Sequence, residues 1–261
     1  MSHDRSPLPI PLDEATSHST RLQDAAAKSL VIPQAGEGDN VSLRDHHIKA
    51  VLFDLDGTFA DTAPDLAAAL NHVRGQRGLP PLPLETVRPQ ASHGARGLLK
   101  LGFGIGPDAP DFDTLRECFL DYYAAHICIH TRLFPEMAQL VAALEQRGLP
   151  WGIVTNKPHR FTVPLMQALG YARRAACLIS GDTCARAKPY PDQLFKASEI
   201  MGIAPANCLY LGDDLRDMEA AQAAGMRGII ARYGYIDAQT NLDNWHADGG
   251  VDMPLTLLNY I

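Results

Sequence analysis

Two hydrophobic patterns alternate along most of the chain. Short, continuous apolar runs are separated by longer segments in which apolar residues recur every three or four positions. The short runs are typical of buried parallel strands, whereas the wider spacing predicts amphipathic helices. Regular alternation of the two predicts a doubly wound α/β fold, in which helices cover both faces of a parallel sheet. The predicted strands are 49–53, 151–155, 177–180, 208–213 and 228–231, and the predicted helices of this part are 136–147, 161–169, 192–201, 215–224 and 254–261.

The region after the first apolar run carries helical spacing only. We predict helices at 63–74, 84–87, 94–101 and 112–126, and no strand between residues 65 and 132. Residues 65–132 are therefore expected to form a small all-α block inserted after the first strand. The α/β core would then comprise residues 47–64 and 133–261.

Residues 1–46 follow neither pattern. They are rich in Pro, Ser, His and Asp at first and in Gly and acidic residues later, with little apolar surface. This composition is typical of a flexible leader. The apolar segment of a secretory signal is absent from it.

The overall composition limits the expected partners. Hydrophobic residues make up 46% of the chain, and the formal net charge is −7 at neutral pH. The acidic balance argues against a binder of nucleic acid or of an anionic membrane, and no run approaches the roughly 20 apolar residues of a membrane span. The five cysteines include no Cys-x-x-Cys pair, which favours a reducing, cytoplasmic setting. The sequence leaves monomer and homodimer open.

The first apolar run ends in two carboxylates. The stretch Asp54-Leu55-Asp56-Gly57-Thr58 follows it directly. Residues two apart on an extended segment point the same way, so Asp54 and Asp56 can face one small volume. Their mutual repulsion is relieved if a divalent cation lies between them or if one carboxyl holds a proton. Taken by itself, the stretch is better explained as an ordinary strand-to-turn junction, where Asp, Gly and Thr are common.

Further polar residues follow the other predicted strands. In a doubly wound sheet, ligands bind beyond the carboxyl ends of the strands. A carboxylate there can attack phosphorus to give an aspartyl-phosphate. The transition state of this attack carries negative charge on the phosphoryl oxygens. A hydroxyl, an ammonium group and a hard cation such as Mg²⁺ stabilise that charge. The residues expected at this edge are Asp54, Asp56, Thr155, Asn156, Lys157, Lys188, Asp213, Asp214 and Asp217.

The residues just named, in the order in which they occur along the chain, form motifs that resemble those of the haloacid dehalogenase superfamily of phosphohydrolases. The resemblance covers nearly all of residues 49–261. The resemblance implies that Asp54 is the nucleophile and Asp56 the general acid/base. It implies that Thr155 and Lys188 hold the phosphoryl oxygens. It also implies a Mg²⁺ cofactor, and the implied metal-binding residues are Asp54, Asp56 through its backbone carbonyl, and Asp213, with support from Asp214 or Asp217.

The helical block resembles the mobile cap of that superfamily, which excludes water and carries specificity. Within it, Ser92-His93-Gly94-Ala95-Arg96 is a glycine-containing loop at the start of a predicted helix, where backbone amides can face an anion. We therefore expect Ser92, His93, Gly94 and Arg96 to bind substrate, together with Asn156.

The substrate is expected to be a small phosphorylated metabolite. The chain resembles phosphoglycolate-phosphatase-like enzymes. Stretches such as 151–158, 212–217 and 233–236 look most like those of bacterial N-acetylmuramic acid 6-phosphate phosphatases, which serve cell-wall sugar recycling. N-acetylmuramic acid 6-phosphate is therefore the expected substrate, with 2-phosphoglycolate as the alternative.

Other activities of this fold fit the sequence less well. A dehalogenase lacks the second aspartate that stands here as Asp56. A phosphonatase needs a lysine in the cap, and the surroundings of Lys100, the only lysine of residues 65–132, do not match. A non-catalytic binding module would lack a nucleophile or a phosphate-binding lysine, and both are present. A phosphomutase shares the core motifs and stays open.

Overall fold

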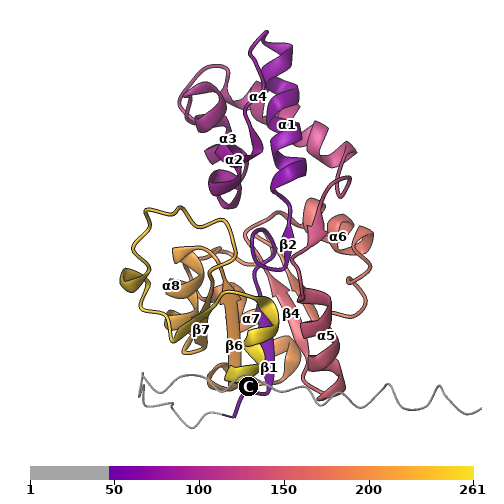
Figure 1. Cartoon of the computed structure of the whole chain (residues 1–261), viewed down its shortest axis with the longest axis vertical. Coiled ribbons are helices and arrows are strands. Elements are labelled where there is room, and N and C mark those ends of the chain that lie inside the picture. The colour runs from indigo at the N-terminus through magenta and orange to yellow at the C-terminus, as the bar shows by residue number, and fades with distance from the viewer. Residues whose placement is uncertain (1–46) are drawn as a thin grey trace, which may run out of the picture. The chain divides into compact units, whose positions relative to one another are not determined.

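A computed structural model describes residues 47–261 of the chain; the expected leader, residues 1–46, lies outside them. Figure 1 shows the order of the elements. No helix of this described part is long and apolar enough to cross a membrane.

The strands are β1 (Ala50–Phe53), β2 (Ala60–Asp61), β3 (Arg132–Leu133), β4 (Trp151–Val154), β5 (Cys177–Ile179), β6 (Cys208–Gly212), β7 (Arg227–Ala231) and β8 (Gly249–Val251). The helices are α1 (Ala63–Gln76), α2 (Leu84–Val87), α3 (Gly94–Phe103), α4 (Phe112–Ala125), α5 (Met137–Gln146), α6 (His159–Ala168), α7 (Asp192–Met201) and α8 (Leu215–Ala224), with short 3₁₀ turns η1 (Arg88–His93), η2 (Pro205–Asn207), η3 (Leu242–Trp245) and η4 (Pro254–Tyr260).

Six parallel strands form the main sheet, in the order β5-β4-β1-β6-β7-β8. The first strand of the chain thus lies inside the sheet, with β4 on one side and β6 on the other. Phe53 is aligned with Ile153 of β4 and with Leu211 of β6, so these three strands end at the same level. The predicted α/β class with a parallel sheet is confirmed, and its strand ends meet at one edge.

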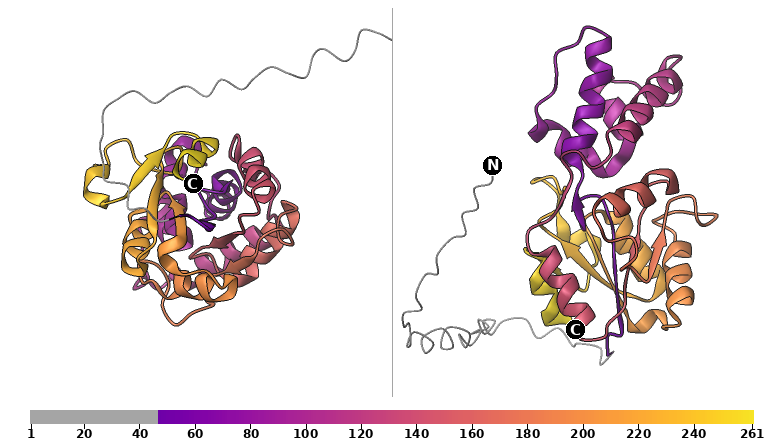
Figure 2. Two further views of the ribbon diagram at one scale, coloured as in Figure 1. Left: turned by 90° about the horizontal axis from the view of Figure 1, so that it is seen from below. Right: turned by 90° about the vertical axis from the view of Figure 1, so that its right-hand side faces the viewer.

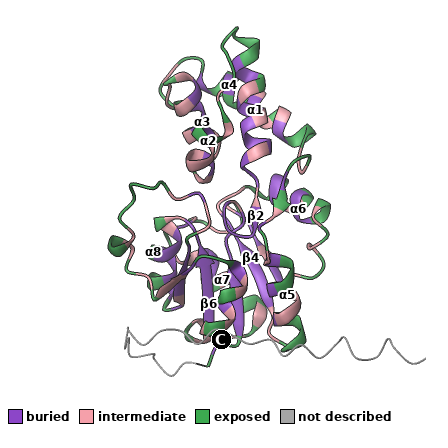
Figure 3. Ribbon diagram, in the orientation of Figure 1, coloured by how far each residue is buried: buried purple, intermediate pink, exposed green. Residues whose placement is uncertain are grey.

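The alternating side chains of β1 belong to two separate cores. Val51 and Phe53 pack in the cluster that also contains residues of α5 and α6. Ala50 and Leu52 pack in the cluster that contains residues of α7 and α8. Both faces of β1 are fully buried, which explains why its sequence is apolar throughout. Figure 3 shows the buried central strands and the exposed outer sides of the helices around them.

The four helices α1 to α4, which we call the helical block, share a third hydrophobic cluster. It contains buried residues of all four helices, including Leu70, Val87, Leu98 and Phe119, and it extends to Phe161 of α6 and to Tyr235. The block lies beyond the carboxyl ends of the central strands in the side views (Figures 1 and 2). The chain enters it through β2 and leaves it through β3, and these two short strands pair antiparallel.

Six short elements of the described residues were not predicted from the sequence. They are β2, β3, β8, η1, η2 and η3. The strands among them have two or three residues, too few to show an alternating pattern, and β8 contains two glycines. The structure also places Arg132, at the end of the stretch expected to lack strands, in β3.

Candidate active site

Asp54 and Lys188 form the centre of the site. Asp54 follows the last residue of β1, and its Oδ1 accepts a hydrogen bond of 2.7 Å from the Lys188 Nζ. Lys188 also lies 2.7 Å from Asp217 and donates to the Tyr210 hydroxyl. Burial alone would lower the pKa of Lys188, but Asp217 and Asp54 raise it above its ordinary value. The ammonium group therefore stays charged beside the Asp54 carboxylate.

Asn156 fixes the loop that carries Lys188. Its side-chain amide donates to the Lys188 carbonyl at 2.9 Å and accepts from the Lys188 N–H at 3.0 Å. The Lys188 N–H is shared with Gln193, which also holds the backbone of Thr155. Asn156, expected to bind substrate, thus lies at the pocket but uses its amide to position Lys188.

Three buried carboxylates lie close together. Oxygens of Asp54, Asp213 and Asp217 are all within 4.8 Å of one another. Burial raises the pKa of Asp54 to about 7, with Lys188 acting against that shift and Asp217 adding to it. Burial, with the charges of Asp54 and Asp217, likewise raises the pKa of Asp213 well above its ordinary value. A divalent cation would relieve this excess of negative charge, and oxygen ligands are those that Mg²⁺ prefers.

The last motif contributes two aspartates with different environments. Both oxygens of Asp217 are held by the protein: Oδ1 by Lys188 and Tyr210, and Oδ2 by the Asp214 N–H. Asp214 lies outside the cluster of three. It caps α8 and forms a two-pronged ion pair with Arg216. Burial would raise the pKa of Asp214, but the hydrogen bonds from Arg216 lower it. Of the two aspartates that the sequence left open as metal support, Asp217 is the one beside Asp54 and Asp213.

Asp56 is held by only one of its two oxygens. Its Oδ1 accepts hydrogen bonds from the Thr62 hydroxyl at 2.6 Å and from the Lys157 Nζ at 2.8 Å. Within residues 47–261, Oδ2 has no hydrogen-bond partner. The first oxygen therefore fixes the carboxyl group, and the second is available to give or take a proton.

Gly57 allows the turn between Asp56 and Thr58 to approach Asp213. Its φ is +89°, a conformation that L side chains rarely adopt. A Cβ at this position would lie 2.1 Å from Oδ2 of Asp213. Thr58, one residue later, donates to the other Asp213 oxygen at 2.9 Å. The turn after β1 is thus fitted against the carboxylate that ends β6.

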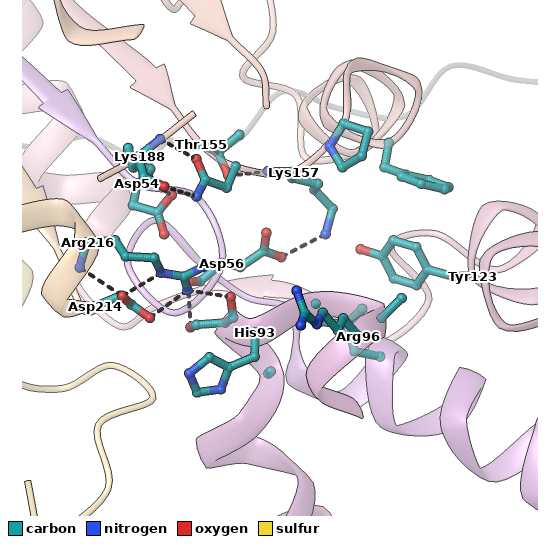
Figure 4. A pocket seen from close by; sticks show the side chains of 18 of the residues that line it. Asp54, Asp56, His93, Arg96, Tyr123, Thr155, Lys157, Lys188, Asp214 and Arg216 are labelled. Atoms are coloured by element: carbon teal, nitrogen blue, oxygen red, sulfur yellow. Dashed lines mark hydrogen bonds and ion pairs between the residues drawn. The ribbon is translucent and has the colours of Figure 1, made fainter. Parts of the chain in front are cut away.

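The site opens into a pocket of about 320 Å³ between the sheet edge and the helical block. Figure 4 shows the pocket from close by. Every residue predicted for the site lines it except Asp213, which belongs to the carboxylate cluster with Asp54 and Asp217. The predicted residues that line it are Asp54, Asp56, Ser92, His93, Gly94, Arg96, Thr155, Asn156, Lys157, Lys188, Asp214 and Asp217.

The helical block touches the sheet edge through the turn η1. The Ser92 hydroxyl lies 3.3 Å from Oδ2 of Asp213 and 3.5 Å from the Asp56 carbonyl. The Ser92 carbonyl accepts from Arg216 at 3.0 Å. His93 and Arg96 are exposed, with their side chains at the pocket.

Several residues of the site were missed by the sequence reasoning. Arg116 and Tyr123 of α4 line the pocket, although the helical spacing of α4 marked only its packing face. Arg216 lies between Asp214 and Ser92, and no spacing rule predicts that contact. Lys157 was itself expected at the sheet edge, but its hydrogen bond to Asp56, 101 residues away in sequence, was not predicted.

Comparison with known proteins identifies a family and several relatives. Residues 48–225 match the family described as haloacid dehalogenase-like hydrolase. The chain is 44% identical over 214 residues to the N-acetylmuramic acid 6-phosphate phosphatase of Pseudomonas aeruginosa, covering 82% of this chain and 95% of that protein. It is 42% identical over 206 residues to a phosphoglycolate phosphatase of Xanthomonas campestris, covering 79% and 93% of the two chains.

Solved structures show the same fold. A crystal structure described as that of a predicted phosphoglycolate phosphatase from Haemophilus somnus superimposes with a TM-score of 0.73 at 26% identity, covering 81% of this chain and 97% of that one. The family match covers well over half of the chain, and the relatives are aligned over most of their own length. The chain therefore belongs to the haloacid dehalogenase-like hydrolase family and is a phosphatase of that family.

Proposed function

We propose that the protein hydrolyses a phosphate monoester through an aspartyl-phosphate formed on Asp54, with Mg²⁺ as cofactor. The observation that carries the proposal is the pairing of Asp54 with Lys188 beside Asp213, at the base of a pocket. Lys188 holds one oxygen of Asp54. Within the described residues the other oxygen has no partner, so it is available to attack phosphorus.

The remaining groups have complementary roles. Thr155 accepts the Lys157 N–H at its Oγ1, which leaves its hydroxyl proton for a phosphoryl oxygen. Lys188 neutralises charge that develops on the phosphoryl group. Oδ2 of Asp56 gives a proton to the leaving oxygen and then takes one from the water that hydrolyses the aspartyl-phosphate.

The metal would be held by Asp54, Asp213 and the backbone carbonyl of Asp56, with Asp217 fixing the surrounding hydrogen bonds. When bound, Mg²⁺ supplies positive charge to the phosphoryl oxygens. The fit of the site to a cation rests on the raised pKa of Asp54 and of Asp213, both caused first by burial. Asp214 is not proposed as a ligand, because its charge is neutralised by Arg216.

We further propose that residues 65–132 act as a cap over a core of residues 47–64 and 133–261, and that N-acetylmuramic acid 6-phosphate is the substrate. Arg96 and Arg116 line the pocket, and neither has an ion-pair partner in the part of the chain that the structure describes. Two free cations suit a substrate with a carboxylate besides its phosphate. Leu66, Phe119 and Phe161 add apolar wall for the body of a sugar derivative.

The second candidate is 2-phosphoglycolate, which also carries a carboxylate. The relative from Xanthomonas campestris is named for it, whereas the relative from Pseudomonas aeruginosa is named for the muramic acid ester. An apolar wall and a pocket of about 320 Å³ favour the larger substrate.

The test is the ratio of kcat/KM for the two compounds with Mg²⁺ present. We expect the ratio to favour N-acetylmuramic acid 6-phosphate by at least about tenfold, or about 1.4 kcal/mol of transition-state binding. N-acetylglucosamine 6-phosphate, which lacks the carboxylate, is the matched control and is expected to be poorer. A tenfold preference for 2-phosphoglycolate would overturn the substrate and leave the phosphatase activity in place.

A further inference from the structure

Tyr123 of α4 reaches from the helical block to the groups that hold Asp56. The Lys157 Nζ lies over its ring, 4.7 Å from the centroid, and the same Nζ pairs with Oδ1 of Asp56 at 2.8 Å. Tyr123 lines the pocket. Figure 4 shows its hydroxyl pointing into the pocket, toward Lys157 and Asp56.

The hydroxyl proton of Tyr123 has no acceptor in the protein. The residue is 2% exposed, and within residues 47–261 no acceptor pairs with its Oη; the polar group beside it is the Lys157 ammonium, which is a donor. Lys157, the charged group beside it, can only donate hydrogen bonds, so it cannot accept the hydroxyl proton. Burial raises the pKa of Tyr123 to about 12, and the phenol therefore keeps that proton. A buried donor without an acceptor destabilises a protein unless something else supplies the acceptor.

The place of this donor identifies the part of the ligand that it meets. Asp56 exchanges its proton with the leaving oxygen, so the leaving alcohol lies on the Asp56 side of the phosphorus. Tyr123 approaches from that same side, over Lys157, and away from Asp54 and Lys188. A group on the leaving alcohol, and not a phosphoryl oxygen, is therefore the acceptor within reach.

We propose that Tyr123 determines specificity by donating a hydrogen bond to an oxygen of the leaving alcohol, such as a hydroxyl or ring oxygen of a sugar. The proposal rests on the phosphatase activity and on the role of Asp56, but it does not depend on which sugar phosphate is the substrate. It makes the enzyme selective for alcohols that carry an oxygen near the ester, since an alcohol without one leaves the phenol unpaired.

The test compares Tyr123→Phe with the wild-type enzyme on two esters. One is the sugar phosphate that the wild-type enzyme hydrolyses best, and the other is cyclohexylmethyl phosphate, whose ring has no oxygen. The variant keeps the ring over Lys157 and loses only the hydroxyl. We expect kcat/KM to fall about tenfold on the sugar ester and to change by less than about twofold on the carbocyclic ester, with no fall in melting temperature.

Tyr122→Phe is the matched control. Tyr122 precedes Tyr123 in α4 but stacks between His72 and His126, at ring-centroid distances of 4.1 and 4.0 Å, outside the pocket. This variant should have the wild-type kcat/KM on both esters.

Three results would overturn the proposal. The first is an equal loss on the two esters. The second is a lower melting temperature of Tyr123→Phe, which would show that the hydroxyl has a structural partner. The third is a wild-type enzyme that hydrolyses no oxygenated ester better than cyclohexylmethyl phosphate. If N-acetylmuramic acid 6-phosphate fails as substrate but another sugar phosphate shows the Tyr123 effect, only the proposed substrate falls.

Discussion

At the scale of single residues, the two oxygens of Asp56 differ in their contacts. Thr62 and Lys157 both bind Oδ1, which fixes the plane of the carboxyl group. The free Oδ2 can then exchange a proton without changing the orientation of the side chain. Burial alone would lower the pKa of Lys157, but Asp56 raises it above the ordinary value, so the anchoring group stays charged.

Lys157→Met is expected to weaken this anchoring. The nearly isosteric side chain keeps the packing on Tyr123 but donates no hydrogen bond to Asp56. We expect kcat for an alkyl phosphate to fall by about 10², because a poorly oriented acid protonates the leaving oxygen slowly. For p-nitrophenyl phosphate, whose leaving group needs no proton, the loss should be several-fold smaller. Lys196→Met, which removes an exposed ion pair with Glu199, is the control and should change neither rate. Equal losses on both esters would contradict the role given to Lys157.

Asp54→Asn is expected to abolish turnover while the fold survives. The amide has the same shape as the carboxylate but cannot attack phosphorus, so kcat should fall by a factor on the order of 10⁴ or more. A steady-state assay with Mg²⁺ measures the loss, and circular dichroism checks the fold. Substantial Mg²⁺-dependent activity in this variant would refute an aspartyl-phosphate on Asp54.

A site residue could be predicted from the sequence only where its role depends on residues close to it in the chain. Asp54 and Asp56 were predicted to share a volume because alternation along a strand is local, and both line the pocket. The contacts of Arg216 with Ser92 and of Lys157 with Asp56 join distant segments, so no local pattern reports them. The hydrogen bonds by which Asn156 holds Lys188 could not be predicted either, because they too join distant segments.

At the scale of elements, the turn after β1 packs against the carboxylate of Asp213, which follows β6. Gly57 brings the backbone against Asp213, and Gly234, from the segment after β7, approaches the same residue from another side.

The strands and helices longer than three residues were predicted well, because their hydrophobic periods repeat. The two-residue pair β2 and β3 could not be, since two residues show no period.

Gly57→Ala is expected to disturb this junction. The new Cβ would meet the Asp213 carboxylate, and an alanine at φ +89° is strained by about 1–3 kcal/mol. We expect a melting temperature lower by roughly 3–10 °C and a weaker Mg²⁺ affinity in calorimetric titration. Gly75→Ala in α1, where a Cβ meets nothing within 4 Å, is the matched control. It should be neutral or slightly stabilising. A Gly57→Ala protein with wild-type Mg²⁺ affinity would contradict the link to Asp213.

At the scale of the whole molecule, the buried carboxylates couple stability to pH and to metal. Asp54 has a pKa of about 7 in the folded protein against an ordinary value of 3.8, and Asp213 is shifted in the same direction. Between about pH 4 and pH 7 the metal-free folded state therefore holds protons that the unfolded chain has released. Its free energy of unfolding accordingly decreases as the pH rises through that range.

Melting temperatures in the presence of a chelator are expected to be higher at about pH 5 than at about pH 8. Excess Mg²⁺ should raise the melting temperature by more at the higher pH, where no proton has to be displaced from the carboxylates. The Asp54→Asn variant should show less of the pH effect, because it lacks one of the groups that titrate. A metal-free protein whose melting temperature increases over this range would refute the charge balance described for the site.

The antiparallel pair β2 and β3 has a consequence for the engineering of the chain. Ala60 is aligned with Leu133 and Asp61 with Arg132, so the two points where the chain crosses between sheet and helical block are neighbours. Neighbouring residues of such a pair have Cα atoms only about 5 Å apart. In topological terms, residues 62–131 are one long hairpin loop, and a short turn could close the same gap. We therefore expect that the block of a relative could be grafted by joining two adjacent chain ends, provided that the contacts of Ser92 with Asp213 and Arg216 are kept.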